Sequence, residues 1–291
     1  MSPDHWHLTE DIDAFLARAG DFLRSRPALH TTPLTTLDRL RRRGADAYGG
    51  EATVLGRLEA GGEVRALFYR PPTHRLTLTP LSPEEADRLA AHLAGLGHHL
   101  SGVTADHDTA TAFAEAWQRH AGATPTAGWW GRLHRLGTLT PPEPLPDGRG
   151  RLVAARDHEQ LVRWCAEFLT AVGETPAVDA GSWADSRFAE KHFTFWETPD
   201  GTPVSMAGST SMIGGMIRVD PVYTPAHLRG RGYAGAVTVE VSRAALTAGA
   251  TDVVLFTNPA NPTSNALYRR IGYDPVADFT GYDFSCDNAG D

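Results

Sequence analysis

Two arginines and three glycines lie close together at residues 229–235, where the sequence reads R-G-R-G-Y-A-G. Apolar residues recur at helical spacing directly after this run, so the glycines stand at the start of a predicted helix. Glycines at a helix start leave backbone N–H groups bare, and the helix dipole favours an anion there. We therefore expect a cradle for a phosphate or pyrophosphate. Its residues are Arg229, Gly230, Arg231, Gly232, Tyr233 and Ala234.

The glycine spacing also fits G-x-G-x-x-G, the fingerprint of dinucleotide-binding proteins. That fingerprint requires a strand directly before the first glycine and a carboxylate at the end of the next strand. Here residues 225–229 separate the preceding strand from Gly230, and the next predicted strand ends at Thr257 and Asn258 without a carboxylate. The context argues against a nicotinamide-dependent oxidoreductase. That function stays open as a third possibility, behind the two described below.

A second segment favours another interpretation. Residues 261–273 read N-P-T-S-N-A-L-Y-R-R-I-G-Y. Together with the run at 229–234, this segment resembles the GNAT N-acetyltransferase superfamily, whose motifs are R-x-x-G-x-A and N-x-x-A-x-x-L-Y-x-x-x-G-F. Ser264 replaces the usual alanine and Tyr273 the usual phenylalanine, and both departures are mild. The resemblance covers residues 151–284.

The resemblance implies an N-acetyltransferase that moves an acetyl or other acyl group from acetyl-CoA to a primary amine, by direct attack in a ternary complex. Residues 229–234 would bind the pyrophosphate, and the strand before them would hydrogen-bond the pantetheine arm. Asn261 precedes a proline, so it is equally consistent with a turn former. The other residues implied to contact the cofactor are Val222, Tyr223, Thr224, Asn258, Asn261, Ser264 and Tyr268.

Acyl transfer to an amine needs a neutral nucleophile and a proton for the departing thiolate. Tyr268 matches the tyrosine proposed in the family to protonate the leaving sulfur, although a phenol packed on its helix with a satisfied hydroxyl is the alternative. Asp220, on the strand leading into the loop, and Glu197, at the end of an earlier strand, are the candidate bases. A chain of waters could replace both. The sequence shows no metal-ligand cluster, so no metal is expected.

Predicted helices and strands follow a similar order in the two parts of the chain. In the second part, Asp157 is expected to cap a helix with Gln160 completing the capping box, and a short helix is expected at 183–188. The resemblance implies a mixed α/β fold, the acyl-CoA N-acyltransferase (GNAT) fold, in two tandem copies. The strands predicted in the second part are 152–155, 192–197, 204–211, 216–224, 253–256 and 281–284.

This repeat predicts three parts. A degenerate GNAT-like domain without cofactor is expected at 1–140, a proline-rich linker at 141–150 and a catalytic GNAT domain at 151–291. Where the second domain has its glycine loop, the first has Ser82, Pro83 and two glutamates, which would repel an anion. The first domain would occupy the surface on which many single-domain relatives dimerise, so we expect a monomer.

Composition narrows the class of protein. The chain has 291 residues, a net charge of −8 and two cysteines. The acidic balance disfavours nucleic-acid partners, and no apolar run reaches membrane-spanning length. The N-terminal residues lack the pattern of a signal peptide, so a cytoplasmic location is expected. A catalytically silent acyl-CoA-binding regulatory module is the alternative function, and the acceptor amine and acyl chain stay open.

Overall fold

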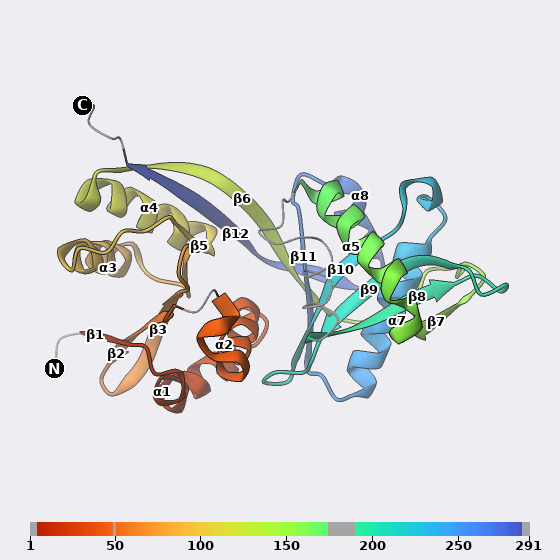
Figure 1. The fold of residues 1–291 in the computed structure, drawn as a ribbon, viewed down its shortest axis with the longest axis horizontal. Coiled ribbons are helices and arrows are strands. Elements are labelled where there is room, and N and C mark those ends of the chain that lie inside the picture. Colours follow the sequence, from red (N-terminus) through yellow and green to blue (C-terminus); the bar gives the residue numbers. More distant parts are fainter. Residues whose placement is uncertain (1–4, 49–50, 174–189, 287–291) are drawn as a thin grey trace. The chain divides into compact units, whose positions relative to one another are not determined.

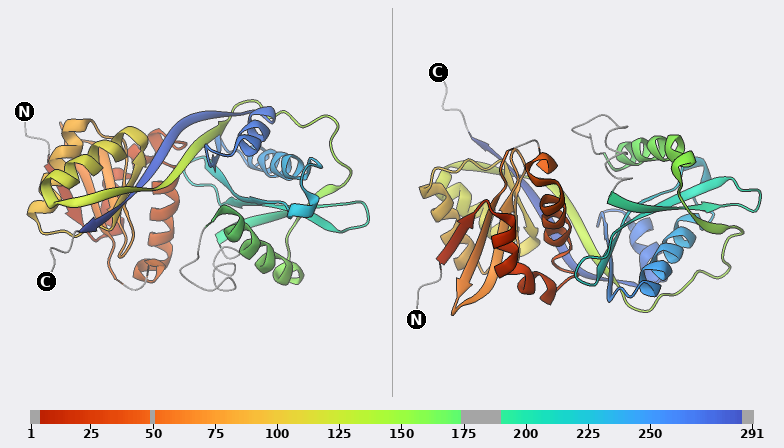
Figure 2. Two further views of the ribbon diagram at one scale, coloured as in Figure 1. Left: turned by 90° about the horizontal axis from the view of Figure 1, so that it is seen from above. Right: turned by 60° about the horizontal axis from the view of Figure 1, so that its bottom comes forward.

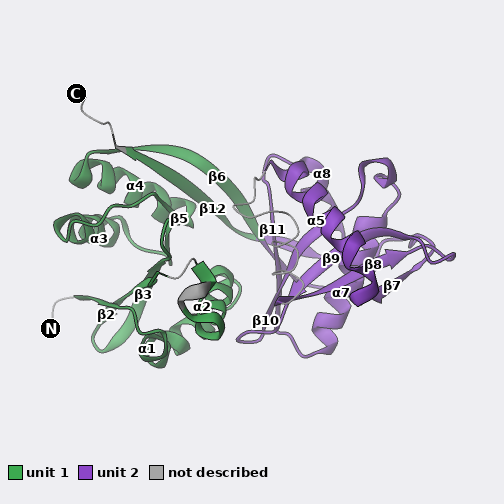
Figure 3. Ribbon diagram, viewed as in Figure 1, with its two compact units in different colours: residues 1–133, 276–291 green, residues 134–275 purple. Residues whose placement is uncertain are grey.

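The computed structural model describes residues 5–48, 51–173 and 190–286, so the helix expected at 183–188 lies outside the described residues. These residues form two compact units (Figure 3). Unit 1 comprises residues 1–133 with 276–291, and unit 2 comprises residues 134–275. Each unit is a mixed sheet with helices packed on it (Figure 1).

The sheet of unit 1 has the strand order β1-β2-β3-β4-β5-β12. Helix α3 begins at a reciprocal capping box between Ser82 and Glu85, with proline in its first turn. Helix α1 is capped by the side chain of Asp11. The elements are β1 (His5–Thr9), α1 (Ile12–Ser25), α2 (Thr31–Arg43), β2 (Val54–Ala60), β3 (Glu63–Arg70), β4 (Leu76–Leu78), α3 (Pro83–Gly95), β5 (Gly102–Asp106), α4 (His107–Ala121) and β6 (Ala123–Leu136).

The sheet of unit 2 has the order β6-β11-β10-β9-β8-β7. Helices α7 and α8 cover one face and α5 covers the other (Figure 2). The elements are β7 (Arg149–Leu152), α5 (His158–Val172), β8 (Lys191–Glu197), β9 (Pro203–Thr210), β10 (Met216–Tyr223), α7 (Tyr233–Thr247), β11 (Asp252–Thr257), α8 (Pro262–Arg270) and β12 (Tyr273–Cys286).

Two apolar cores hold unit 2 together. One lies between α7, the end of α8 and the sheet, and includes Val237, Val253 and Tyr273. The other lies under α5 and includes Trp164 and Phe195. Burial of apolar surface on both faces explains why β11 reads as a continuous apolar run, Val253 to Phe256, in the sequence.

The same succession of elements occurs twice, which confirms two tandem copies of one mixed α/β fold. In unit 1, β3 and β4 are antiparallel, β4 and β5 are parallel, and α3 connects the parallel pair. In unit 2, β9 and β10 are antiparallel, β10 and β11 are parallel, and α7 connects them. A parallel pair needs such a crossover, so each copy places one helix N-terminus just beyond a strand end.

The last strands of the two copies do not stay within their own sequence halves. Residues Phe279 to Asp283 of β12 pair antiparallel with β5 in unit 1. The end of β6, from His134, belongs instead to unit 2, where β6 neighbours β11. The compact units therefore have other bounds than the expected domains 1–140 and 151–291. The reason is that the pairing of strands from distant segments determines to which unit a segment belongs.

Two local expectations differ from the structure. The carboxylate of Asp157 does not cap α5, and no box with Gln160 forms. Instead Asp157 accepts hydrogen bonds from the Arg151 guanidinium at 2.7 and 2.9 Å and from the Ala154 N–H at 2.8 Å. The 14-residue strand β6 was not predicted at all, because its glycines and exposed polar residues mask the strand pattern.

Two further findings concern the described residues. None of their helices is long and apolar enough to cross a membrane. They also contain no group of three histidine, cysteine, aspartate or glutamate side chains arranged to hold a metal ion.

Candidate active site

The glycine loop before α7 has the backbone conformation that the sequence leads one to expect. Gly230 has φ +78° and Gly232 has φ +83°, values that residues with a Cβ rarely adopt. A Cβ at Gly230 would meet no atom within 4 Å, and one at Gly232 would meet only Pro146, at 3.6 Å. The space beside these two glycines is therefore open, and the segment that contains Pro146 borders it on one side.

Helix α7 starts without a side-chain cap. Gly232 occupies the N-cap position, and the first backbone hydrogen bond across this turn runs from the Ala236 N–H to the Gly232 carbonyl, at 3.1 Å. Among the described residues, nothing accepts a hydrogen bond from the N–H groups of Tyr233, Ala234 and Gly235. These three donors, together with the positive end of the helix dipole, form an anion site.

Two guanidinium groups stand beside these donors. The Nε of Arg229 donates to the Thr224 carbonyl at 3.0 Å, which holds that side chain close to the end of β10. Arg231 is exposed and its Nη2 lies 3.4 Å from the His227 carbonyl. Among the described residues neither arginine forms an ion pair, so both can attract a diphosphate without losing one.

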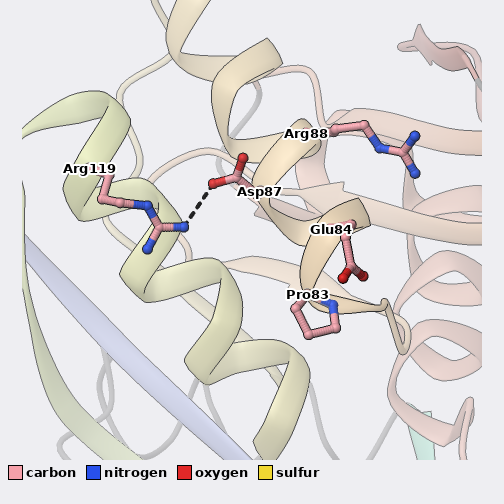
Figure 4. Close-up of a pocket in the computed structure, with 5 residues that line it drawn as sticks. All are labelled: Pro83, Glu84, Asp87, Arg88 and Arg119. Carbon is pink, nitrogen blue, oxygen red and sulfur yellow. Dashed lines mark hydrogen bonds and ion pairs between the residues drawn. The ribbon is translucent and has the colours of Figure 1, made fainter.

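The equivalent helix of unit 1 is closed to anions. Glu85 donates its N–H to the Ser82 hydroxyl at 3.2 Å, and the Glu85 carboxylate accepts the Ser82 N–H at 2.8 Å. Pro83 has no N–H to offer. Figure 4 shows the shallow hollow at this helix start, where Asp87 accepts a hydrogen bond from Arg119 at 2.8 Å. Acidic side chains thus occupy the place that an anion would need.

Strands β10 and β11 separate next to the glycine loop. Their parallel ladder joins Met216 to Arg218 with Asp252 to Val254 and goes no further along the described strands. Beyond it, β10 stays attached to β9, with Val222 opposite Ala207. The β10 edge from residue 219 to residue 223 therefore presents backbone groups that β11 does not use.

Tyr268 lies on α8, buried against Tyr273 in an edge-to-face contact with ring centroids 6.1 Å apart. Its hydroxyl makes no hydrogen bond to another described residue. Burial, followed by Tyr273 and the charge of Asp220, raises the pKa of the Tyr268 phenol. The phenol therefore stays protonated at neutral pH, as a proton donor must.

Asp220 is paired with Lys191, the single lysine of the chain. The ammonium donates to the Asp220 carboxylate and, at 2.8 Å, to its backbone carbonyl. The lysine side chain is 3% exposed, whereas that of Asp220 is 39% exposed. The Asp220 carboxylate is therefore only partly covered, and its charge acts on Tyr268.

Glu197 lies at the other end of β8 from Lys191. Six residue steps of about 3.3 Å put the two ends about 20 Å apart. The Glu197 side chain is 6% exposed and accepts a hydrogen bond from the Arg151 Nε at 2.6 Å. The same guanidinium lowers the pKa of Asp157. The structure thus brings Tyr268 and Asp220 within electrostatic reach of each other and leaves Glu197 apart.

The polar residues after β11 fix the start of α8. Asn261 caps α8, its side-chain oxygen accepting the Ser264 N–H at 3.1 Å, and Asn258 accepts the Ala260 N–H at 2.8 Å. The turn-forming role of Asn261 is therefore present in the structure. Sequence reasoning missed Asn265, which is buried and accepts a hydrogen bond from Thr257 at 2.8 Å.

Asn265 belongs to a buried polar group. Its side-chain nitrogen donates to the carbonyls of Asn258 and Asn261, at 3.0 and 2.6 Å. The Nε2 of His134 lies 3.1 Å from the Thr257 hydroxyl. This network attaches the α8 start to β11 and β6, and an asparagine next to a turn carries no sequence signal of such burial.

The aromatic residues of β8 belong to the apolar core, as is usual for aromatic side chains in folded proteins. Phe193, Phe195 and Trp196 are all buried. His192 and His227 are exposed.

Comparisons with known proteins agree with this geometry. The family model "FR47-like protein" matches residues 209–279, which contain both sequence motifs. Among solved structures, a tandem GNAT protein from the clavulanic acid biosynthesis pathway is 11% identical, with a TM-score of 0.59. The alignment covers 99% of this chain and 100% of that one. The chain has the GNAT fold, in two tandem copies.

Other GNAT structures match over nearly the whole chain. A GCN5-related N-acetyltransferase from Sphaerobacter thermophilus is 19% identical over 97% of this chain and 96% of its own, with a TM-score of 0.58. A GNAT-family acetyltransferase from Colwellia psychrerythraea is 12% identical over 97% and 100%, with a TM-score of 0.60. No curated protein matches the sequence. These likenesses establish the GNAT fold, and the reaction has to be argued from the site.

Proposed function

We propose that the second GNAT copy is an acetyl-CoA-dependent N-acyltransferase that acts on a primary amine. The observation that carries this proposal is the set of bare N–H groups at Tyr233, Ala234 and Gly235, in a loop whose glycines leave open space. These donors and two adjacent arginines fit the diphosphate of coenzyme A. The first copy, whose equivalent helix is capped by its own carboxylate, would bind no cofactor.

The residues proposed to hold the cofactor follow the loop and the strand before it. Arg229 to Ala234 would bind the diphosphate. Val222, Tyr223 and Thr224, at the end of β10 beyond its pairing with β11, would bind the pantetheine arm. Asn258, Asn261 and Ser264 flank the start of α8 and would contact the cofactor from there. When bound, acetyl-CoA supplies an acyl group activated as a thioester.

Tyr268 is the proposed acid, because burial keeps its hydroxyl protonated and no described neighbour holds that hydroxyl. It would donate its phenolic proton to the departing sulfur. Asp220 is the proposed base or, through a water, the acceptor of the amine proton. Glu197 is the weaker candidate for two reasons. Its carboxylate is hydrogen-bonded to Arg151, and it lies about 20 Å along β8 from Lys191, the partner of Asp220.

A silent acyl-CoA-binding module is the second candidate, since Asp220, the carboxylate whose charge acts on Tyr268, is held in an ion pair with Lys191. Calorimetry with coenzyme A and acetyl-CoA, combined with a thiol-release assay over a panel of amines, separates the two. Binding with thiol release supports the transferase. Binding without release for any amine supports the module, and absence of binding removes both.

Assembly and location are further expectations of this proposal. A chain that already contains two GNAT copies is expected to be a monomer, and light scattering that showed a stable dimer would contradict this. The acidic balance of residues 151–291 suits a cationic amine as acceptor. The scarcity of cysteines suits a reducing compartment such as the cytoplasm.

A further inference from the structure

The proline-rich segment 140–148 lies against the glycine loop rather than hanging free as a linker. Its start is fixed by two backbone hydrogen bonds, from the Gly137 N–H to the Gly272 carbonyl at 2.9 Å and from the Thr140 N–H to the Ile271 carbonyl at 3.1 Å. Its end is fixed near β8, where the Trp196 indole N–H lies 3.4 Å from the Asp147 carbonyl. Both attachments lie within unit 2.

Between these attachments the segment passes the start of α7. The ring of Pro146 lies 3.6 Å from the position of a Cβ at Gly232. The ring of Pro142 lies 3.9 Å from the position of a Cβ at Gly235, beside Leu267. The segment therefore borders the proposed diphosphate site with apolar ring surface and, at its prolines, without N–H donors.

The same segment exposes apolar surface to solvent. Leu145 is 45% exposed and stands directly before Pro146, with Pro144 on its other side. Exposure of a leucine side chain to water is unfavourable, and covering that side chain with a flat apolar group lowers the free energy. The flanking side chains of Glu143 and Asp147 are acidic and exposed, so the strip offers no positive charge of its own and its apolar surface suits an uncharged ring.

Resting on the proposed function, we propose that Leu145, Pro146 and Pro142 form the surface on which the adenine ring of the acyl-CoA donor packs. The nucleoside is joined directly to the diphosphate in coenzyme A, so a ligand held at Gly232 places its purine within reach of a neighbouring apolar strip. The loop amides and arginines bind charge, whereas the strip binds the uncharged ring. The linker is thereby part of the donor site.

The test compares ligands with and without the nucleoside. Leu145→Ala and Pro146→Gly are measured by calorimetry against coenzyme A and against 4′-phosphopantetheine, which keeps one phosphate and lacks adenosine. Leu145→Ala is expected to weaken coenzyme A binding about fivefold to tenfold and to leave 4′-phosphopantetheine unchanged. Pro146→Gly, which loosens the strip next to the loop, is expected to weaken coenzyme A binding in the same selective way.

Leu246→Ala is the matched control. Leu246 is 43% exposed and lies in the last turn of α7, about 20 Å from the helix start. It should leave both affinities unchanged. Equal weakening of both ligands by Leu145→Ala, or no weakening of either, would overturn the inference. If the wild-type protein bound neither ligand, the proposed function itself would fail, which is a distinguishable outcome.

Discussion

Replacement of Gly232 by aspartate tests the proposed diphosphate site directly. The aspartate would stand at the N-cap of α7, where its carboxylate can accept hydrogen bonds from the N–H groups that the ligand needs. It would also put a negative charge next to the bound diphosphate, taken for the estimate as about 5 Å away. At an effective dielectric constant of about 20, one such pair of charges costs about 3 kcal/mol.

Solvent reduces this cost, because Gly232 is exposed. A screened cost of about 1.5–3 kcal/mol predicts that the affinity for coenzyme A falls about tenfold to hundredfold. The strain of a Cβ at φ +83° costs about 1–2 kcal/mol in folding free energy, and the new helix cap returns about 1 kcal/mol. The variant should therefore stay folded. Calorimetry measures the affinity, and thermal unfolding measures the stability.

Gly249→Asp is the matched control. Gly249 has φ +91°, no atom would lie within 4 Å of its Cβ, and it follows the opposite end of the same helix. This variant carries the same charge and similar strain, and it should bind coenzyme A normally. The reasoning is refuted if folded Gly232→Asp binds coenzyme A within twofold of the wild type.

Three further predictions concern the acid, the base and the fold. Tyr268→Phe should lower kcat at least about a hundredfold without changing the affinity for coenzyme A. Tyr273→Phe is its control: it loses a hydroxyl that is hydrogen-bonded to Ser242, so it should mainly lower stability. Because burial raises the pKa of Tyr268, the loss of activity at high pH should lie above the ordinary tyrosine value of about 10. Asp220→Asn should lower kcat/KM about tenfold or more, and Glu197→Gln should lower only stability; the reverse pattern would exchange their roles. A chain restricted to residues 151–291 lacks the part of β6 that belongs to unit 2, so circular dichroism should find it poorly folded, and a cooperative, native-like unfolding transition would contradict this.

Local sequence patterns were sufficient to predict the glycine loop at residues 229–235 and the helix that follows it. Glycines at residues 230 and 232 predict a left-handed turn, and the apolar spacing that follows predicts α7. The cap of α3 is likewise a local feature, because Ser82 and Glu85 are three residues apart. Two copies of one succession of helices and strands could also be inferred, since each element is encoded over a short window.

Only the tertiary structure decided how distant segments meet. No local pattern indicates that β12 pairs with β5, or that Lys191 pairs with Asp220 while Arg151 takes Glu197. The path of the proline-rich segment beside Gly232 was equally hidden, because it depends on hydrogen bonds to the turn after α8 and to Trp196. Contacts between residues far apart in sequence depend on the packed chain as a whole. The sequence therefore determined the residue types of the site, and the fold determined which of them act together.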